Sequence, residues 1–280
     1  MKKTLTLLAL TISFSMNAQL TAVSEGGNTG QRLSTSNASN HGDIGSNAVD
    51  LSFEDFSSTT KGATGTSSVA MGYSTTASGN YSTAMGYDTT ASGTVSAAIG
   101  DQTTASDYAS VVIGQYNSSG SSATRARSFS TSAPAFGIGN GTASNAKSDA
   151  FKVMFNGDTT VSNDLTVSGD VVISSDARLK SNIVSLGSTL PKLLQIDGKS
   201  YEMKGKQKIG VLAQEIKEVF PELVSEDDNE MLAVNYQGLV PVLINALKEQ
   251  QSEIDRLKEQ EKKINRLEKI LIKLTENYED

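Results

Sequence analysis

The hydrophobic positions between residues 68 and 117 recur at a fixed interval. Four apolar residues lie 14 positions apart and are each followed by glycine: Met71, Met85, Ile99 and Ile113. Each of the first three repeats holds a short apolar run such as Val69-Ala-Met71 and then a Thr-Thr-Ala-Ser run. A fixed short period is typical of stacked units, because each unit buries its apolar face only against its neighbours. We therefore predict two short strands with turns per repeat, one coil of a parallel β-roll, over residues 68–123.

The first strand of each repeat is apolar on both of its faces. Val69 and Met71 share one face, and Ala70 lies on the other. A strand buried on both sides needs a packing surface beyond its own roll, and association of chains about an axis provides one. We predict a trimer in which the four Met and Ile side chains align in one interior column. A disordered linker rich in Ser, Thr and Gly is the alternative, but a strict period with placed Met and Ile is not a feature of linkers.

The segments on either side of the repeats give weaker patterns. Residues 19–67 are rich in Asn, Ser and Gly, and we expect an irregular cap on the roll. The single histidine, His41, has no partner histidine or cysteine, so we expect a loop residue and not a metal ligand. After the repeats, apolar alternation and the turn pair Asn156-Gly157 predict a β-rich neck over residues 124–174.

From Ser188 the pattern changes to that of an α+β domain. Pro191 suits the first turn of a short helix, and a second helix is predicted from Ala213 to Val219. Short apolar runs on either side of residues 225–230 predict a hairpin with an acidic turn. A calcium loop is the alternative there, but the spaced ligands and the glycine of such loops are missing.

A long charged helix is predicted from about Pro241 toward Asn277. Its apolar residues fit two heptad frames, which change around Glu261. The first frame holds Val240, Leu243, Leu247, Ile254 and Leu257, and the second holds Ile264, Leu267, Leu271 and Leu274. The length and the interleaved charges favour a self-associating coiled coil over residues 241–280. A lone amphipathic helix packed on its own domain is the alternative.

The chain begins with the pattern of an export signal. Lys2 and Lys3 precede an apolar run, and small residues up to Ala18 end it. This layout predicts a cleaved signal peptide over residues 1–18, with an ordinary N-terminal helix as the alternative. No later stretch is long and apolar enough to span a bilayer. With no cysteine in the chain, stability outside the cell has to come from packing and oligomerisation.

The stretch from Ser175 to Ile183 holds the candidate chemistry. A lysine that burial keeps neutral can activate a serine in place of a histidine, and here Ser175 and Lys180 lie five positions apart. Spacing alone is weak evidence, and it fits a helix-capping serine with a surface lysine as well. On a regular α-helix, positions five apart are separated by about 140° around the axis. The two side chains can therefore meet only if the chain turns between them, for example at Ser174-Ser-Asp176, or if the lysine stem bridges the gap. Arg178 would disfavour the charged form of Lys180 if the two lay close together.

Three motifs in a fixed order carry a family resemblance. The stretch from Ser175 to Ile183 is followed by Ile209–Val224, by Val234–Leu247 and by the charged helix. Together they resemble the C-terminal intramolecular chaperone domain of phage tailspikes and endosialidases, a self-cleaving peptidase family. The resemblance implies a chaperone domain over residues 175–240, with Ser175 as nucleophile, Lys180 as general base and cleavage between Ser174 and Ser175. The 14-residue repeats likewise resemble the head repeats of trimeric autotransporter adhesins, which implies a three-chain β-roll.

These patterns predict an exported homotrimeric fibre, mainly β in its N-terminal part and α+β in its C-terminal part. The chaperone would drive assembly and then release itself by a single-turnover cleavage. We expect no cofactor and no metal, and the net charge of −7 without an isolated basic patch argues against a nucleic-acid partner. A surface glycan or a protein is the expected class of ligand for the head, on the cell surface or in the medium.

Three alternative functions stay open. A phage tail fibre carries the same kind of chaperone, but the export signal argues against it. A polysaccharide-degrading enzyme is disfavoured by the absence of tryptophan and of a paired-carboxylate site. A fibre whose chaperone does not cleave itself is the third.

Overall fold

The computed structural model of the chain describes residues 20–118, 126–227 and 230–276. The predicted signal peptide, residues 1–18, lies outside them. The chain divides into two compact units, a head unit up to Val171 and a C-terminal unit from Val172 onward. In the described ranges, no helix is both long enough and apolar enough to cross a membrane.

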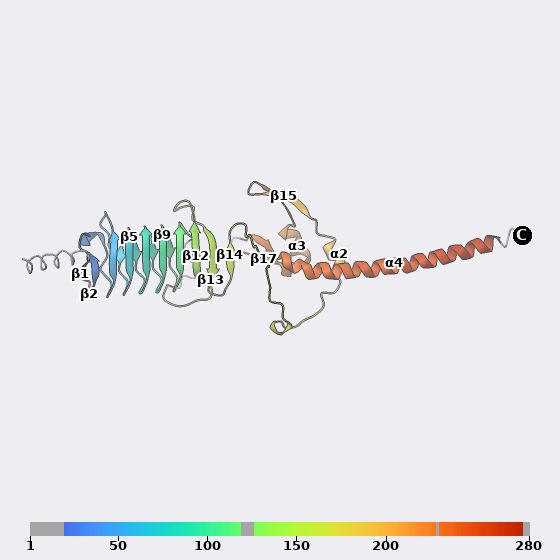
Figure 1. The fold of residues 1–280 in the computed structure, drawn as a ribbon, viewed down its shortest axis with the longest axis horizontal. Helices are drawn as coiled ribbons and strands as arrows, with labels where there is room; N and C mark the ends of the chain where they lie inside the picture. Colours follow the sequence, from blue (N-terminus) through green and yellow to red (C-terminus); the bar gives the residue numbers. More distant parts are fainter. Residues whose placement is uncertain (1–19, 119–125, 228–229, 277–280) are drawn as a thin grey trace, which may run out of the picture. The chain divides into compact units, whose positions relative to one another are not determined.

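Parallel strands stacked in register build most of the head unit (Figure 1). The long sheet holds ten strands in the order β1-β2-β3-β5-β7-β9-β11-β12-β13-β14, and the short sheet holds β4, β6, β8 and β10. The strands of the long sheet are β1 (Leu20–Glu25), β2 (Asn28–Leu33), β3 (Val49–Phe53), β5 (Val69–Tyr73), β7 (Thr83–Tyr87), β9 (Ala97–Asp101), β11 (Val111–Gln115), β12 (Pro134–Asn140), β13 (Asp149–Met154) and β14 (Thr159–Val161). Those of the short sheet are β4 (Gly62–Ala63), β6 (Thr76–Ala77), β8 (Thr90–Ala91) and β10 (Thr104–Ala105). The prediction of two short strands per repeat is confirmed for the first three repeats, while the described residues of the fourth repeat, 110–118, hold β11 alone.

The register aligns equivalent positions from coil to coil. Met71 pairs with Met85, Met85 with Ile99, and Ile99 with Ile113, so the predicted column of Met and Ile exists. In the single chain, however, this column does not lie inside the roll. The first two side chains keep 37% of their surface exposed and Ile99 keeps 38%. The column lies on the outer face of the long sheet, and its burial needs a second surface.

The inside of the roll is a column of small side chains. Neighbouring residues of a strand point to opposite faces, so the residue before each Met or Ile points inward. Ala70, Ala84 and Ala98 are fully buried, and Val112 takes the same position in the last repeat. The alanines of the short sheet, such as Ala77 and Ala91, face them from the other wall. The narrow interior therefore excludes the larger Met and Ile side chains.

The glycine after each Met or Ile is required by the stacking. Gly86 has a φ of +128°, which L side chains rarely adopt. A Cβ at Gly86 would also collide with the carbonyl oxygen of Gly100 in the next coil. These glycines therefore serve the backbone and are not part of a ligand loop.

The stacking extends beyond the repeats in both directions. The structure corrects the prediction of an irregular cap, because residues 20–67 contain β1 to β4, and β3 and β4 continue the two sheets in parallel register. Backbone pairing there needs no repeated side chains. After the repeats, β12 joins β11 in parallel, and β13 and β14 follow antiparallel. Beyond Val161, the alternating apolar residues do not form a strand. Residues 162–174 have no regular secondary structure.

The C-terminal unit combines short helices, two hairpins and one long helix. Its elements are η2 (Ala177–Leu179), α2 (Leu190–Leu193), β15 (Lys199–Met203), β16 (Lys206–Gly210), α3 (Ala213–Val219), η3 (Pro221–Leu223), β17 (Val224–Glu226), β18 (Leu232–Val234), η4 (Tyr236–Gly238) and α4 (Leu239–Glu276). The helices α2, α3 and α4 and the hairpin β17–β18 lie where the sequence predicted them. Hairpin β15–β16 was not predicted, because polar and charged residues dominate its strands.

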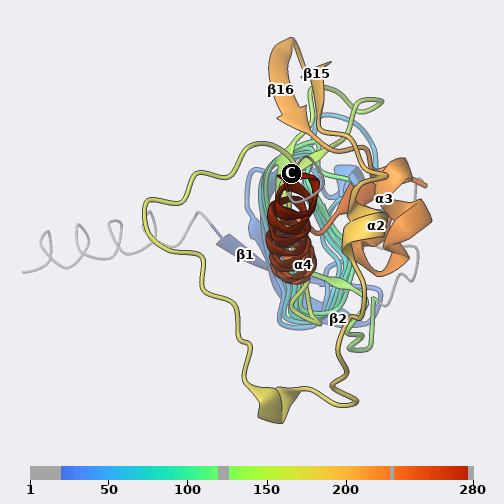
Figure 2. The ribbon, with the colours of Figure 1, turned by 90° about the vertical axis from the view of Figure 1, so that its right-hand side faces the viewer.

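A small core holds the C-terminal unit together. Ile216 and Phe220 from α3 and its end pack with Val242 of α4, and all three are buried. The irregular segment between Val172 and Ser188 lies outside this core. In Figure 2 it loops away from α2, α3 and α4. The segment that carries Ser175 and Lys180 therefore has few contacts within its own chain.

Candidate cleavage site and assembly surfaces

The structure brings the predicted serine and lysine together. The Nζ atom of Lys180 donates a hydrogen bond of 2.8 Å to the Oγ atom of Ser175. One turn of 3-10 helix, η2, lies between the two residues and folds the chain back. The side chain of Asp176 caps this turn by accepting from the backbone NH of Arg178. The required turn thus exists, slightly later in the chain than Ser174–Asp176.

Arg178 is held by Asp176. Its Nη2 lies 2.7 Å from Asp176 Oδ2 and its Nε lies 3.0 Å from Oδ1. These hydrogen bonds from Arg178 hold the pKa of Asp176 below its usual value. The positive charge of Arg178 is therefore paired with a carboxylate of opposite charge.

The surroundings of the serine–lysine pair are open to solvent in the single chain. Ser175 and Lys180 are both exposed, although a lysine that acts as a base needs burial to lose its proton. The apolar side chains near the pair are exposed as well, with Val172 at 88%, Leu179 at 72% and Val184 at 81%. Such a concentration of exposed apolar residues is typical of a surface that another chain covers.

A carboxylate from the long helix anchors the chain just after this segment. Glu249 of α4 accepts from the backbone NH of Thr189 at 2.5 Å and from the Ser188 hydroxyl at 2.7 Å. Thr189 also donates from its hydroxyl to the carbonyl oxygen of Val242 at 3.1 Å. We call the contacts of Glu249 with residues 188–190 the Glu249 clamp. Sequence reasoning missed it, since only the Ser-Thr pair before Pro191 hints at a helix start.

We expect the Glu249 clamp to weaken in acid. The backbone NH of Thr189 and then the Ser188 hydroxyl lower the pKa of Glu249. A lowered pKa in the folded state means that the stabilisation is complete above the usual value of about 4.5 and is lost as the pH falls through the lowered value. Hydrogen exchange should therefore show the protection of the Thr189 amide falling with acid, relative to its intrinsic rate.

A control for this experiment lies in the same unit. The Phe220 amide, which donates to Ile216 at 2.7 Å, should keep its protection over the same pH range. In Glu249→Gln the Thr189 amide should be less protected at neutral pH and lose its dependence on acid. Equal protection in this variant and the native chain would contradict the role of the carboxylate.

The long helix has two apolar faces, of which one is exposed in the single chain. Val242 belongs to the unit's own core, and Val242 and Ala246 are each 3% exposed. The heptad residues Leu243 and Leu247 lie on another face and are 45% and 63% exposed. Further along, Ile264, Leu267, Ile270, Leu271 and Leu274 line an apolar groove of about 400 Å³. The heptad stripe is therefore not the face that packs on the helix's own domain.

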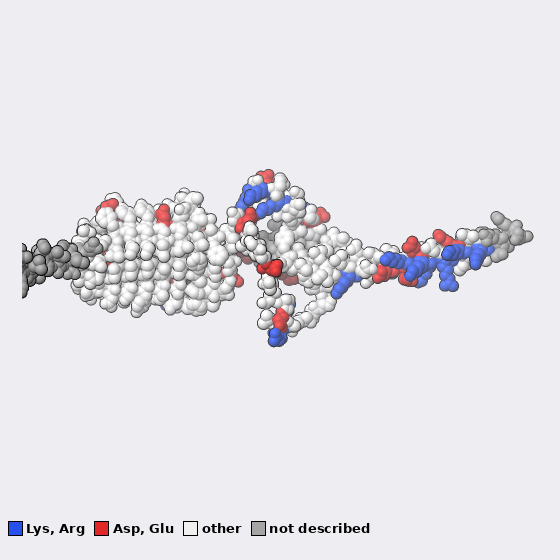
Figure 3. Space-filling model, in the orientation of Figure 1, with Lys and Arg blue, Asp and Glu red and all other residues white. Residues whose placement is uncertain are grey.

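Lys and Arg gather along α4 and on hairpin β15–β16, while the visible face of the head is almost uncharged (Figure 3).

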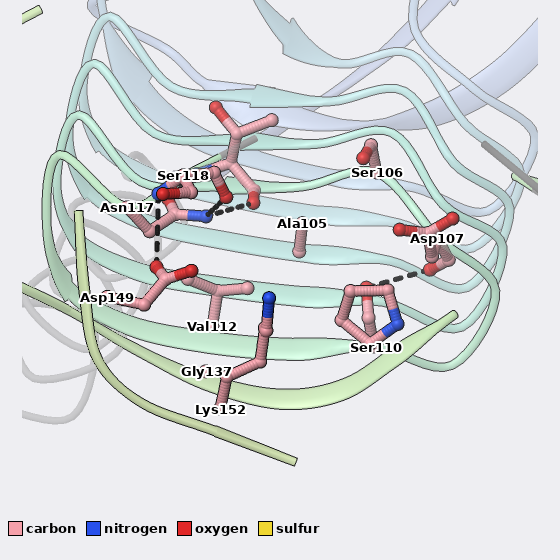
Figure 4. A pocket seen from close by; sticks show the side chains of 12 residues that line it. Ala105, Ser106, Asp107, Ser110, Val112, Asn117, Ser118, Gly137, Asp149 and Lys152 are labelled. Atoms are coloured by element: carbon pink, nitrogen blue, oxygen red, sulfur yellow. Dashed lines mark hydrogen bonds between the residues drawn. The ribbon is translucent and has the colours of Figure 1, made fainter. Parts of the chain in front are cut away.

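The head contains a small cavity at its last coil, which Figure 4 shows from close by. Its volume is about 40 Å³, and Lys152 of β13 reaches into it beside Val112. Asp149 lies at its edge, where burial raises the pKa of the carboxyl group, and accepts from the backbone NH of Ser118 at 3.0 Å. A space of this size suits only a few water molecules, so we assign no ligand to it.

Comparison with known families gives a match in each of the two units. Residues 175–225 match the family model described as chaperone of endosialidase. Residues 63–89 and 91–117 match two copies of the YadA head domain repeat. The chain joins YadA-type head repeats to an endosialidase-type chaperone. A comparison with curated proteins gives no match.

Both resemblances drawn from the sequence are thus confirmed. The YadA-type repeats form the stacked coils of the head, and the first match begins at β4. The chaperone match begins at Ser175, the first residue of the serine–lysine pair, and ends within β17. The mainly β head and the α+β chaperone with its long helix agree with the predicted fold class.

Proposed function

We propose that the protein is an exported homotrimeric adhesin-like fibre whose chaperone drives assembly and then cuts itself off between Ser174 and Ser175. The hydrogen bond between Lys180 and Ser175 carries this proposal. The start of the chaperone match at Ser175 supports the position of the cut, because cleavage there would separate the two kinds of domain.

Association of chains is supported by three exposed apolar surfaces. These are the Met and Ile column of the head, the exposed side chains around Ser175 and the heptad stripe of α4. Each of them would be covered if it met the equivalent surfaces of the other chains. A YadA-type head and an endosialidase-type chaperone favour three chains.

The chaperone would help the three chains to associate quickly and in register. Contacts between β segments of different chains form slowly and leave sheet edges open to aggregation. If the α4 helices associate first, they raise the effective concentration of the three heads and set their relative register. Removal of the chaperone afterwards would make assembly irreversible. The fibre would then persist because its dissociation and unfolding are slow.

The cleavage step follows from the roles of the two residues. Neutral Lys180 takes the hydroxyl proton of Ser175 while Oγ bonds to the carbonyl carbon of Ser174. The C–N bond between the two serines breaks, and the proton passes to the leaving nitrogen. Water then hydrolyses the ester, which leaves a carboxylate on Ser174 and restores the Ser175 hydroxyl. Because the pair is exposed in a single chain, we infer that neighbouring chains supply the burial that keeps Lys180 neutral.

The first test of this function is location and mass. In a bacterial host, fractionation should place the head outside the cytoplasm, with an N-terminus at Gln19 after removal of the signal peptide. Sedimentation of the released head should give the mass of three chains. Cytoplasmic protein that keeps residues 1–18 would favour the phage-fibre alternative, and a monomer mass would contradict the assembly.

A charged side chain in the Met and Ile column of the head should prevent trimerisation. We expect Met85→Asp to prevent trimerisation of the head, because three carboxylates would be buried near the axis without partners. Sedimentation would measure the loss. The control is Val95→Asp, since Val95 is also apolar and 47% exposed but lies in a turn with a φ of +63°. A trimer that tolerates Met85→Asp as well as Val95→Asp would show that the column is not an interface.

A further inference from the structure

Asp176 stands at the start of the turn that brings Ser175 and Lys180 together. Its own backbone is extended, with a φ of −60° and a ψ of 133°, and that of Lys180 is extended as well, with −121° and 145°. The chain therefore turns only through the three residues of η2. In a fully extended chain the Cα atoms of Ser175 and Lys180 would lie up to about 17 Å apart, farther than their side chains can bridge. The contact of 2.8 Å between Nζ and Oγ thus depends on this one turn.

The turn has little support from the rest of the chaperone. None of the residues of η2 is buried. The backbone NH of Leu179 donates to the carbonyl oxygen of Asp176 at 3.1 Å, and the NH of Lys180 closes the turn at the same distance from the carbonyl oxygen of Ala177. A single helical turn is marginal in water, because it fixes several dihedral angles for few hydrogen bonds. Side-chain contacts at its start therefore decide how much of the time it is formed.

The carboxylate of Asp176 makes two kinds of contact there. Its Oδ1 caps η2 by accepting from the backbone NH of Arg178 at 2.8 Å, and Asp and Asn are among the best residues for such a cap. The carboxylate also pairs with the guanidinium of Arg178, but these side chains are 43% and 89% exposed. Exposed ion pairs stabilise little, because solvent screening and the ordering of long side chains offset the attraction. The cap is therefore the stronger support of the turn.

We propose that Asp176 is a positioning residue for self-cleavage, and that it acts through the capping oxygen and not through its charge. This inference rests on the proposed function, since it concerns the cut between Ser174 and Ser175. The cap keeps the base in contact with the nucleophile before neighbouring chains cover the pair. Without the cap, η2 would be open for most of the time, and cleavage would slow in proportion to the lost population.

Substitutions at Asp176 separate the cap from the charge. Asp176→Asn keeps a capping oxygen and removes the charge, so it should be cleaved within about twofold of the native rate. Asp176→Glu keeps a charge that can pair with Arg178, but Glu is not a preferred capping residue. We expect it to be cleaved about fivefold more slowly, which corresponds to about 1 kcal/mol, and Asp176→Ala to be equally slow. The measurement is the rate at which the fragment that begins at Ser175 appears from the full-length chain.

Arg178→Gln is the matched control for the ion pair. It keeps the backbone NH that the cap needs and removes only the guanidinium, so its cleavage should stay within about twofold of the native rate. Both substituted positions lie outside the core of the chaperone. All four variants should therefore trimerise, and sedimentation ensures that rates are compared between trimers.

The pattern of rates decides between the cap and the charge. The proposal is overturned if Asp176→Glu is cut like the native chain, if Asp176→Asn is as slow as Asp176→Ala, or if Arg178→Gln is slow as well. If the native chain is cut and all four variants match it, the positioning role fails while the proposed function stands. A native trimer that is never cut overturns both.

Discussion

Ser175→Ala is expected to leave the exported chain in one piece, whereas the native chain should yield two fragments, the second of which begins at Ser175. The variant removes the nucleophile but no contact of the core, so the chain should still trimerise. Lys180→Arg should slow cleavage by about 100-fold or more, because a guanidinium keeps its proton at neutral pH and cannot act as the base. N-terminal sequencing of the smaller fragment and its rate of appearance are the measurements.

A neighbouring serine provides the control. Ser174→Ala changes the residue on the other side of the proposed bond but keeps both the nucleophile and the attacked carbonyl group. It should therefore be cleaved at close to the native rate. If Ser174→Ala blocks processing and Ser175→Ala does not, the nucleophile has been assigned to the wrong residue. Unchanged processing in both variants would mean that the chaperone does not cleave itself.

The second large effect is expected from Leu243→Asp in the long helix. Leu243 belongs to the exposed heptad stripe, while Val242 beside it fills the core of the chaperone. The variant should therefore keep a folded chaperone but bury three carboxylates in the helix bundle, which would dissociate it. We expect monomers in sedimentation and, because the site around Ser175 then stays exposed, no cleavage.

The control for this variant lies on the same helix. Ser252 is exposed and occupies a heptad position away from the stripe, so Ser252→Asp should trimerise and be cut like the native chain. Cleavage of a monomeric Leu243→Asp chain would show that the serine–lysine pair is active without neighbouring chains. That result would contradict the inference that neighbouring chains must bury Lys180 before it can act as a base.

The sequence predicted those parts of the fold in which side-chain spacing reports directly on the backbone. The 14-residue period placed Met71, Met85 and Ile99 in one column, which the register confirms. It did not reveal that the roll is too narrow to hold them, because that follows from the small distance between two walls of alanine. The strands before the repeats escaped prediction because their pairing is made by the backbone and their side chains are mostly polar.

At the candidate site, too, a local contact could be predicted from the sequence, whereas contacts between distant residues could not. Contact between Ser175 and Lys180 was predicted only on condition that the chain turns, and the turn arises from the cap that Asp176 makes on η2. That cap is local and could have been read from Asp176-Ala-Arg178. The Glu249 clamp joins residues 60 positions apart, and Nδ1 of His41 lies 3.0 Å from Oδ2 of the buried Asp50 in the next strand, β3. Neither contact leaves a periodic trace in the sequence.

The two ends of the long sheet determine how far the head can extend. Parallel coils could stack without limit, but here β1 turns back on β2 at one end and β13 and β14 turn back on β12 at the other. These antiparallel hairpins replace the open parallel edges that would otherwise recruit another head end to end. Because both terminators lie outside the 14-residue repeat, copies of the repeat can be added or deleted without altering them. Each copy changes the length by about one strand spacing, ~4.8 Å, so gene duplication could tune the reach of this protein in uniform steps.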